Sequence, residues 1–199
     1  MIVATSAAVL GAVATLGAWM AARAANQTGK SLAGIERHRW HADLTPQFEV
    51  TARASGDATA VLRVELVGPP GLDRLDQVAV SIRDDIRGRA PVTAGGPTAE
   101  QIAAQVWGPY RFAAGADGAD PRGRAVASFD LLLGDWRPLA LERTLPPMWT
   151  ASSSGGGHRW RQQYDGKPVR ITVHCRREGH GPWTVPLEIP VDAGDIPSA

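Results

Sequence analysis

Beyond residue 45 the chain alternates between hydrophobic and polar positions, with the period of a half-buried β-strand. In QFEVTARA (47–54) every second residue is apolar. The same period predicts further strands in AVLRVELVG (60–68), QVAVSIRD (77–84), VASFDLLLG (126–134), RPLALERT (137–144), PVRITVHC (168–175) and PWTVPLEIPV (182–191). Turn-forming glycines and prolines separate these segments. The pattern predicts a mainly β domain over 45–199, an antiparallel, immunoglobulin-like β-sandwich.

One stretch interrupts this alternation. GPTAEQIAAQVWGPYRF (96–112) places Thr98 three residues before Gln101, the spacing of a capping box, so a short helix is expected from about Ala99. Gly108 and Pro109 are expected to end it. The segment that follows, AAGADGADPRGR, is expected to be flexible or rich in turns.

The beginning of the chain has a different pattern. Residues 2–22 contain no charged side chain, and a membrane-spanning helix needs about 20 apolar residues. We therefore expect an uncleaved transmembrane anchor over 1–23, with Trp19 near its end. The alternative is a cleaved signal peptide, because AARAAN offers small residues at a cleavage site, but no Lys or Arg precedes the run. Residues 24–44 are expected to form a helical stalk that ends before Pro46.

The charges beside this run predict its orientation. The basic residues that follow it are Arg23, Lys30, Arg37 and Arg39, and none precedes it. The positive-inside rule then places the main domain of a single-pass cell-membrane protein in the cytoplasm. Small residues recur at four-residue spacing in the run, which would allow weak homodimerisation, although any alanine-rich helix shows such spacing.

Composition narrows the classes of partner. The chain of 199 residues has 21 Lys and Arg against 20 Asp and Glu, so its formal charge of +1 argues against a nucleic-acid binder. RHRWH (37–41) fits a solvated helix face with Trp40 packing on the domain that follows, or contact with anionic lipid headgroups, better than nucleic acid. Cys175 is the only cysteine, which excludes an internal disulfide.

AANQTGKS (24–31) ends like a phosphate-binding loop, but the match fails. That motif needs a glycine where Ala24 stands, on a turn that leaves a β-strand. The segment instead follows the apolar helix, whose amides are already hydrogen-bonded and cannot converge on a phosphate. We expect neither a nucleotide nor any other cofactor.

Other chemistry-bearing residues do not form a recognisable catalytic or metal motif. Ser152–Ser154 lack the strand-turn-helix context of a nucleophile elbow. Adjacent strand residues point to opposite faces, so His174 and Cys175 cannot easily share a metal with His180. Asp84 and Asp85 fit a turn as well as a cation site. No catalytic residue and no metal ligand is predicted, and the protein is not expected to be an enzyme.

The strongest candidate for binding lies in SSSGGGHRWRQQYDGKP (152–168). Its serine and glycine run predicts a mobile loop. The candidate partner-binding residues on this loop are His158, Arg159, Trp160, Arg161 and Tyr164. Trp and Arg dominate binding hot spots, which favours a protein partner or an anionic ligand. The alternative is that Trp160 folds back over the end of the sandwich and leaves the arginines solvated.

The quoted segments GPTAEQIAAQVWGPYRF, KPVRITVHCRREGHGPWTVPLEIPV and IERHRWHADLTPQFEV resemble uncharacterised single-pass, membrane-anchored proteins of actinomycete bacteria. The resemblance implies an anchor but no activity or ligand. Together with the patterns above, it predicts a membrane-tethered interaction module. Two alternatives stay open: an exported, anchored sandwich that uses some of its seven tryptophans to bind cell-envelope carbohydrate, and a hydrolase whose site residues are distant in sequence.

Overall fold

The computed structural model describes residues 39–85, 96–151 and 155–193. The chain divides into two units, Met1–Leu44 and Thr45–Ala199. In the first unit the described residues form a short helix over 39–43, and the Trp40 side chain is exposed.

The predicted anchor lies outside the described residues, together with its flanking Arg23, Lys30 and Arg37, and Arg39 is exposed on the short helix. Among the described residues, no helix is long and apolar enough to span a bilayer.

The second unit is mainly β and contains two sheets. A five-stranded sheet has the order β4-β6-β2-β1-β9, and a four-stranded sheet has the order β5-β3-β7-β8. The strands are β1 (Gln47–Ala54), β2 (Thr59–Gly68), β3 (Arg74–Ile82), β4 (Tyr110–Phe112), β5 (Phe129–Leu132), β6 (Trp136–Arg143), β7 (Val169–Arg176), β8 (Trp183–Ile189) and β9 (Val191–Asp192). Neighbouring strands pair antiparallel, except that β9 runs parallel to β1.

The core lies between the two sheets, and the alternation of the sequence explains it. In β2 the residues Leu62, Val64 and Leu66 are fully buried, whereas Arg63 between them is exposed. β7 presents Ile171, Val173 and Cys175 to the core in the same way. Burying a side chain of the Val, Leu or Ile type contributes about 1.5–3 kcal/mol, so these rows hold the sheets face to face.

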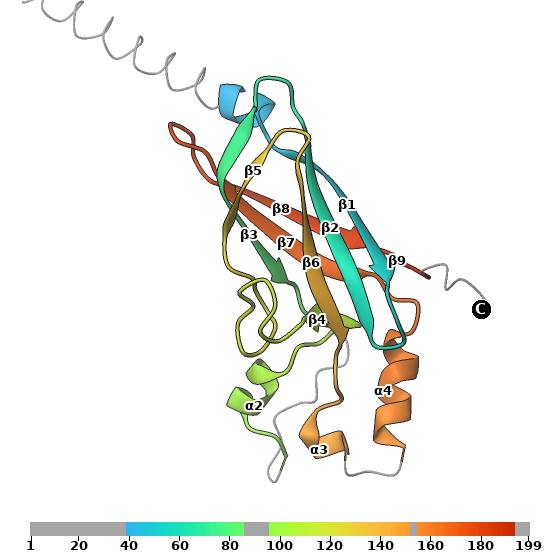
Figure 1. Cartoon of the computed structure of the whole chain (residues 1–199). Helices are drawn as coiled ribbons and strands as arrows, with labels where there is room; N and C mark the ends of the chain where they lie inside the picture. The colour runs from blue at the N-terminus through green and yellow to red at the C-terminus, as the bar shows by residue number, and fades with distance from the viewer. Residues whose placement is uncertain (1–38, 86–95, 152–154, 194–199) are drawn as a thin grey trace, which may run out of the picture. The chain divides into compact units, whose positions relative to one another are not determined.

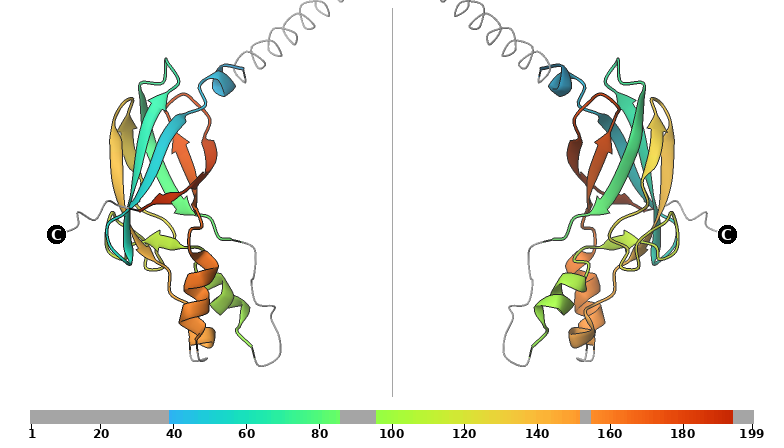
Figure 2. Two further views of the ribbon diagram at one scale, coloured as in Figure 1. Left: turned by 90° about the vertical axis from the view of Figure 1, so that its right-hand side faces the viewer. Right: turned by 90° about the vertical axis from the view of Figure 1, so that its left-hand side faces the viewer.

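The helices α2 (Ala99–Ala104), α3 (Met148–Ala151) and α4 (Gly156–Tyr164) gather at one end of the sandwich (Figures 1 and 2). We call this part of the molecule the helical end. At the opposite end β1 begins, where Gln47 pairs with Gly68.

The sequence predicted α2 and every strand except β4, which lies in the segment that was expected to interrupt the alternation. Each predicted strand segment contains an observed strand, and PWTVPLEIPV holds both β8 and β9. The expected capping box of α2 is present, because the Thr98 hydroxyl accepts a hydrogen bond from the Gln101 amide and the Gln101 side chain accepts one from the Thr98 amide. The helix ends at Ala104, earlier than Gly108, because Gln105 adopts an extended conformation.

The prediction of a loop over the candidate binding residues was wrong, because Gly156–Tyr164 forms the helix α4. The backbone enters this helix through Gly155, whose φ of +81° favours glycine. Trp160 and Tyr164 are four residues apart and therefore share one face, which is buried. The sequence of α4 is mostly polar, so the packing of this aromatic face is what stabilises the helix.

Candidate binding surface at the helical end

A cluster of aromatic side chains holds the helical end together. Trp107, Trp160 and Tyr164 are buried, and Ile102 and Trp149 pack against them. The ring centroids of Trp107 and Trp160 lie 5.6 Å apart, and those of Trp160 and Tyr164 lie 4.7 Å apart with an edge-on geometry. Such pairs stabilise a fold beyond the area they bury. The cluster joins side chains from α2, α3 and α4 to Trp107, close to the start of β4.

Thr144 connects this cluster to the end of β6. Its hydroxyl donates a hydrogen bond to the Gly108 carbonyl and accepts one of 3.1 Å from the Trp160 indole N–H. Thr144 is the buried polar residue of the core, and both hydrogen-bonding roles of its hydroxyl are used. Trp160 is therefore fixed both by packing and by a directional bond.

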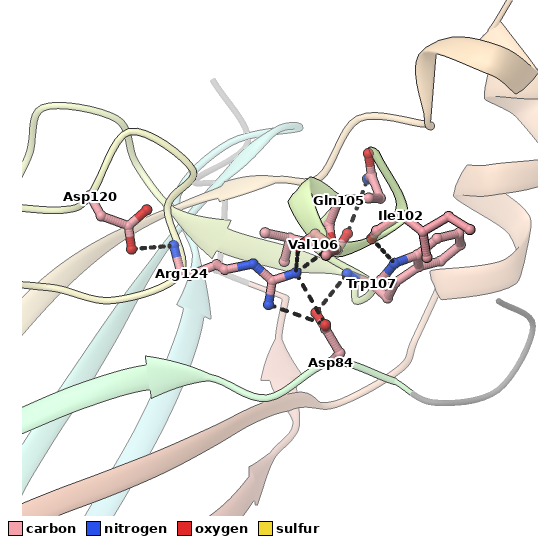
Figure 3. A network of polar contacts seen from close by, with 8 residues as sticks. Asp84, Ile102, Gln105, Val106, Trp107, Asp120 and Arg124 are labelled. Carbon is pink, nitrogen blue, oxygen red and sulfur yellow. Dashed lines mark hydrogen bonds and ion pairs between the residues drawn. The ribbon is translucent and has the colours of Figure 1, made fainter. Parts of the chain in front are cut away.

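Arg124 fastens three segments at the same end (Figure 3). Both terminal nitrogens of its guanidinium lie 3.1 Å from Asp84 Oδ2. The same group donates to the carbonyls of Ala103 and Gln105, where α2 ends. The other carboxylate oxygen of Asp84 accepts a 3.0 Å hydrogen bond from the Trp107 amide. We call this arrangement the Arg124 clamp.

Asp120 shapes the segment that carries Arg124. Its carboxylate accepts hydrogen bonds from the amides of Arg122, Arg124 and Ala125. Partial burial raises the pKa of this carboxyl, but the backbone N–H groups outweigh that effect and lower the pKa overall. The segment expected to be flexible or rich in turns is therefore a series of defined turns that aims Arg124 at Asp84.

Tyr164 lies beside a small cavity of about 20 Å³, which Asp85, Trp107, Lys167 and Arg170 also line. Its hydroxyl is buried and has no hydrogen-bond partner among the described residues. Burial, together with the Asp85 and Asp84 carboxylates, raises the pKa of Tyr164 to about 12, although Arg170 opposes the shift. Organic ligands occupy pockets of roughly 300–1,000 Å³, so this cavity suits nothing larger than a water molecule.

The outer surface of the helical end combines cations with exposed apolar side chains. His158, Arg159 and Arg161 are exposed on α4, which contains no acidic residue. Leu145 is 66% exposed and Met148 is 81% exposed, on the segment that leads into α3. α3 contacts α4, so the two sets of exposed side chains lie on neighbouring segments of the helical end. We call these five residues the helical-end surface.

Of the candidate binding residues, Trp160 and Tyr164 are therefore interior anchors, and His158, Arg159 and Arg161 are surface groups. The alternative in which Trp160 covers the end of the sandwich agrees with its 6% exposure.

The other chemistry-bearing residues are dispersed. His174 is exposed on β7 and lies 3.1 Å from the Thr184 hydroxyl, whereas Cys175 points into the core. The His180 ring stacks on Trp183 with centroids 5.7 Å apart. Asp84 belongs to the Arg124 clamp, and Ser152–Ser154 lie outside the described residues. Across 39–85, 96–151 and 155–193, no group of three or more His, Cys, Asp or Glu side chains could hold a metal ion.

Sequence reasoning missed Arg124, Thr144, Leu145 and Met148. Arg124 sits in a glycine-rich segment, far along the chain from Asp84, and carries no local signal. Leu145 and Met148 stand in TLPPMW, where the two prolines indicate irregular backbone. Large apolar residues beside such a segment were a signal for an exposed apolar surface that the sequence analysis did not use.

Comparison with known proteins adds no family: no protein-family model matches the chain, and no curated protein matches its sequence.

Proposed function

We propose that this protein is a membrane-tethered binding module without catalytic activity, in which an immunoglobulin-like sandwich holds the helical-end surface toward a protein partner. The partner would present acidic groups together with an apolar side chain. The N-terminal run of residues 2–22 would be the single-pass anchor, with the sandwich in the cytoplasm.

The observation that carries the proposal is the exposure of Met148 and Leu145 on a rigid base. The Leu145 carbonyl accepts a 2.9 Å hydrogen bond from the Gln105 side chain, and its neighbour Thr144 is bonded to Trp160. These two contacts hold the backbone at the Leu145 end of the segment, and the Thr150 amide donates a 2.9 Å hydrogen bond to the Pro147 carbonyl beside Met148. A preorganised apolar surface loses little conformational entropy when a partner covers it.

Charge supports the choice of an acidic partner. Arg159 and Arg161 are exposed on α4, whose sequence contains no Asp or Glu. Electrostatic complementarity mainly raises the rate of association and selects the partner, whereas apolar contacts supply more of the affinity. The arginines and Met148 would therefore act together.

The order of strands supports the immunoglobulin-like type. The chain passes from β2 in the five-stranded sheet to β3 in the four-stranded sheet, and returns from β5 to β6. Repeated crossing between two antiparallel sheets is typical of such sandwiches.

Photo-crosslinking in cells tests the proposal on the full chain. A photoreactive amino acid in place of Met148 should give an adduct with one other protein. The same group in place of Val61, an apolar residue 40% exposed in β2, is the matched control and should not give that adduct.

Charge reversal makes the test specific. The double substitution Arg159→Glu, Arg161→Glu should lower the yield of the adduct at least tenfold, while the urea-unfolding midpoint stays unchanged. Arg53→Glu with Arg176→Glu applies the same charge change to exposed strand residues and should leave the adduct intact. No adduct at Met148, or one that survives reversal on α4, would overturn the proposal.

A further inference from the structure

A second group of exposed apolar side chains lies at the end of the sandwich opposite α4. Val67 is 45% exposed, Leu132 49%, Leu133 43% and Trp136 52%. We call these four residues the tip. Val67 is in β2, and the other three surround the turn from β5 to β6.

Hydrogen bonds hold the tip in a fixed shape. The Asp135 amide donates to the Leu132 carbonyl over 3.0 Å, and Gly134 has a φ of +80°, which is the geometry of a type II turn. The Gly134 amide donates to Leu66 over 2.8 Å, which joins this turn to β2. The exposure of Leu133 is therefore built into the backbone and does not reflect a loose loop.

The tip lies where the chain enters the sandwich. Gln47, the first residue of β1, pairs with Gly68, the neighbour of Val67 (Figure 1). The sequence before β1 contains the uncharged run of residues 2–22. If that run is the membrane anchor, the chain leads from it into β1 at the same end of the sandwich as the tip.

Charged side chains of both signs lie around the tip. Arg63 lies over the Trp136 ring at 4.7 Å and forms a 2.7 Å ion pair with Glu65. Arg177 pairs with Asp73 over 2.6 Å. Arg137 and Asp135, the two neighbours of Trp136, are both exposed. The tip therefore does not carry the cluster of cations that recognises anionic lipid or an acidic protein. It fits the interfacial region of a bilayer of zwitterionic lipid, where Trp is enriched.

We propose that the tip inserts into the headgroup region of the membrane to which the chain is tethered. This inference rests on the tether in the proposed function. Four half-exposed side chains bind lipid weakly alone, but the tether makes their insertion intramolecular and raises their effective concentration. The insertion would fix the orientation of the sandwich and direct the helical end away from the membrane.

Site-specific labelling of the full chain tests this inference. A fluorophore on Leu133→Cys is compared with the same fluorophore on Leu145→Cys, which is an exposed leucine at the helical end. The native Cys175 is 1% exposed, so it does not compete for the label. The protein is reconstituted into phosphatidylcholine vesicles whose acyl chains carry bromine near the headgroup. Quenching should be at least threefold stronger at Leu133→Cys, and Trp136→Ala should reduce it.

Flotation of the same samples separates the two proposals. If the chain floats with the vesicles but the two labels are quenched equally, the proposal of tip insertion is wrong and the proposed tether is supported. If the chain does not float, the tether fails and the insertion fails with it. Quenching that disappears at high salt would show an electrostatic contact and overturn insertion, because the proposed contact is apolar.

Discussion

At the scale of single residues, the Thr144 hydroxyl links two parts of the helical end. It donates to the Gly108 carbonyl and accepts from the Trp160 indole, and Thr144 is only 7% exposed. Removing it would leave two buried polar groups without a partner.

We expect Thr144→Val to lower the free energy of unfolding by about 1–3 kcal/mol, the cost of unsatisfied buried polar groups. The isosteric change preserves packing, so the loss reports the hydrogen bonds. Urea denaturation measures it. Thr172→Val on β7, where the side chain is half-buried, is the control and should change stability by less than about 0.5 kcal/mol. Equal effects of the two substitutions would contradict this role of Thr144.

Two buried titratable groups predict a loss of stability at alkaline pH. Burial raises the pKa of the Cys175 thiol to about 11, and the pKa of Tyr164 is raised to about 12. The folded state therefore holds both protons more tightly than the unfolded state. Stability should be constant below about pH 9, and should fall as pH rises to about 11 for Cys175 and from about 10 to about 12 for Tyr164.

Each of these losses should amount to about 2–3 kcal/mol, since one pKa unit corresponds to about 1.4 kcal/mol. Urea denaturation across this pH range measures the slope. Tyr164→Phe should reduce the loss of unfolding free energy in the upper part of the pH range, and Cys175→Ala should reduce it in the lower part. Tyr110→Phe is the control and should change neither loss. An unchanged slope in Tyr164→Phe would contradict the assignment to Tyr164.

At the scale of elements, the Arg124 clamp determines how α2 is attached to the sandwich. α2 has only six residues, too few to be stable alone. Its last carbonyls are bonded to Arg124, which is in turn paired with Asp84 at the end of β3. The helix persists because another element satisfies its C-terminus.

We expect Arg124→Lys to lower the free energy of unfolding by about 2–3 kcal/mol, because a lysine cannot reproduce a bidentate, forked contact. Hydrogen exchange should show the greatest loss of protection in α2. Arg122→Lys, an exposed arginine in the same segment, is the matched control. Retained protection in α2 after Arg124→Lys would show that the clamp does not hold this helix.

The elements also show what local pattern can predict. Alternation predicted β2, β3 and β7 because about half of each strand is buried in one core, and Thr98 with Gln101 predicted the start of α2. α4 was missed because its helical state depends on Trp107, which is distant in sequence. The SSSGGG run before α4 gave a stronger local signal for a loop than HRWRQQY gave for a helix.

At the scale of the whole molecule, the sandwich separates two apolar surfaces. The tip and the helical-end surface lie at opposite ends, so no residue is shared between them (Figure 1). The tip could not be predicted from sequence, because a solvent-exposed leucine and a core leucine give the same local pattern, whereas the three polar residues of the helical-end surface were among the predicted binding residues. The hydrogen bond from the Gly134 amide to Leu66 joins the β5–β6 turn to β2, and contact between α3 and α4 joins two segments of the helical-end surface.

We expect substitutions at the two ends to act independently. Leu132→Ser with Leu133→Ser should weaken vesicle contact but keep the adduct at Met148, and Arg159→Glu with Arg161→Glu should do the reverse. Changes in unfolding free energy of the two pairs should add within about 0.5 kcal/mol, as for distant sites. Crosslinking, quenching and urea denaturation of the combined variant measure this. Non-additive changes in unfolding free energy would contradict the independence of the two ends.

The pairing of β1 has a mechanical consequence. Its hydrogen bonds to β2 run perpendicular to the strand from Phe48 to Ala54, and β9 adds bonds at Ala52 and Arg53. A force that draws Gln47 along the strand would stretch this whole ladder at once instead of opening it bond by bond. The β1–β2 pairing should therefore resist a pull along the strand axis better than a pull that separates the two strands from one end.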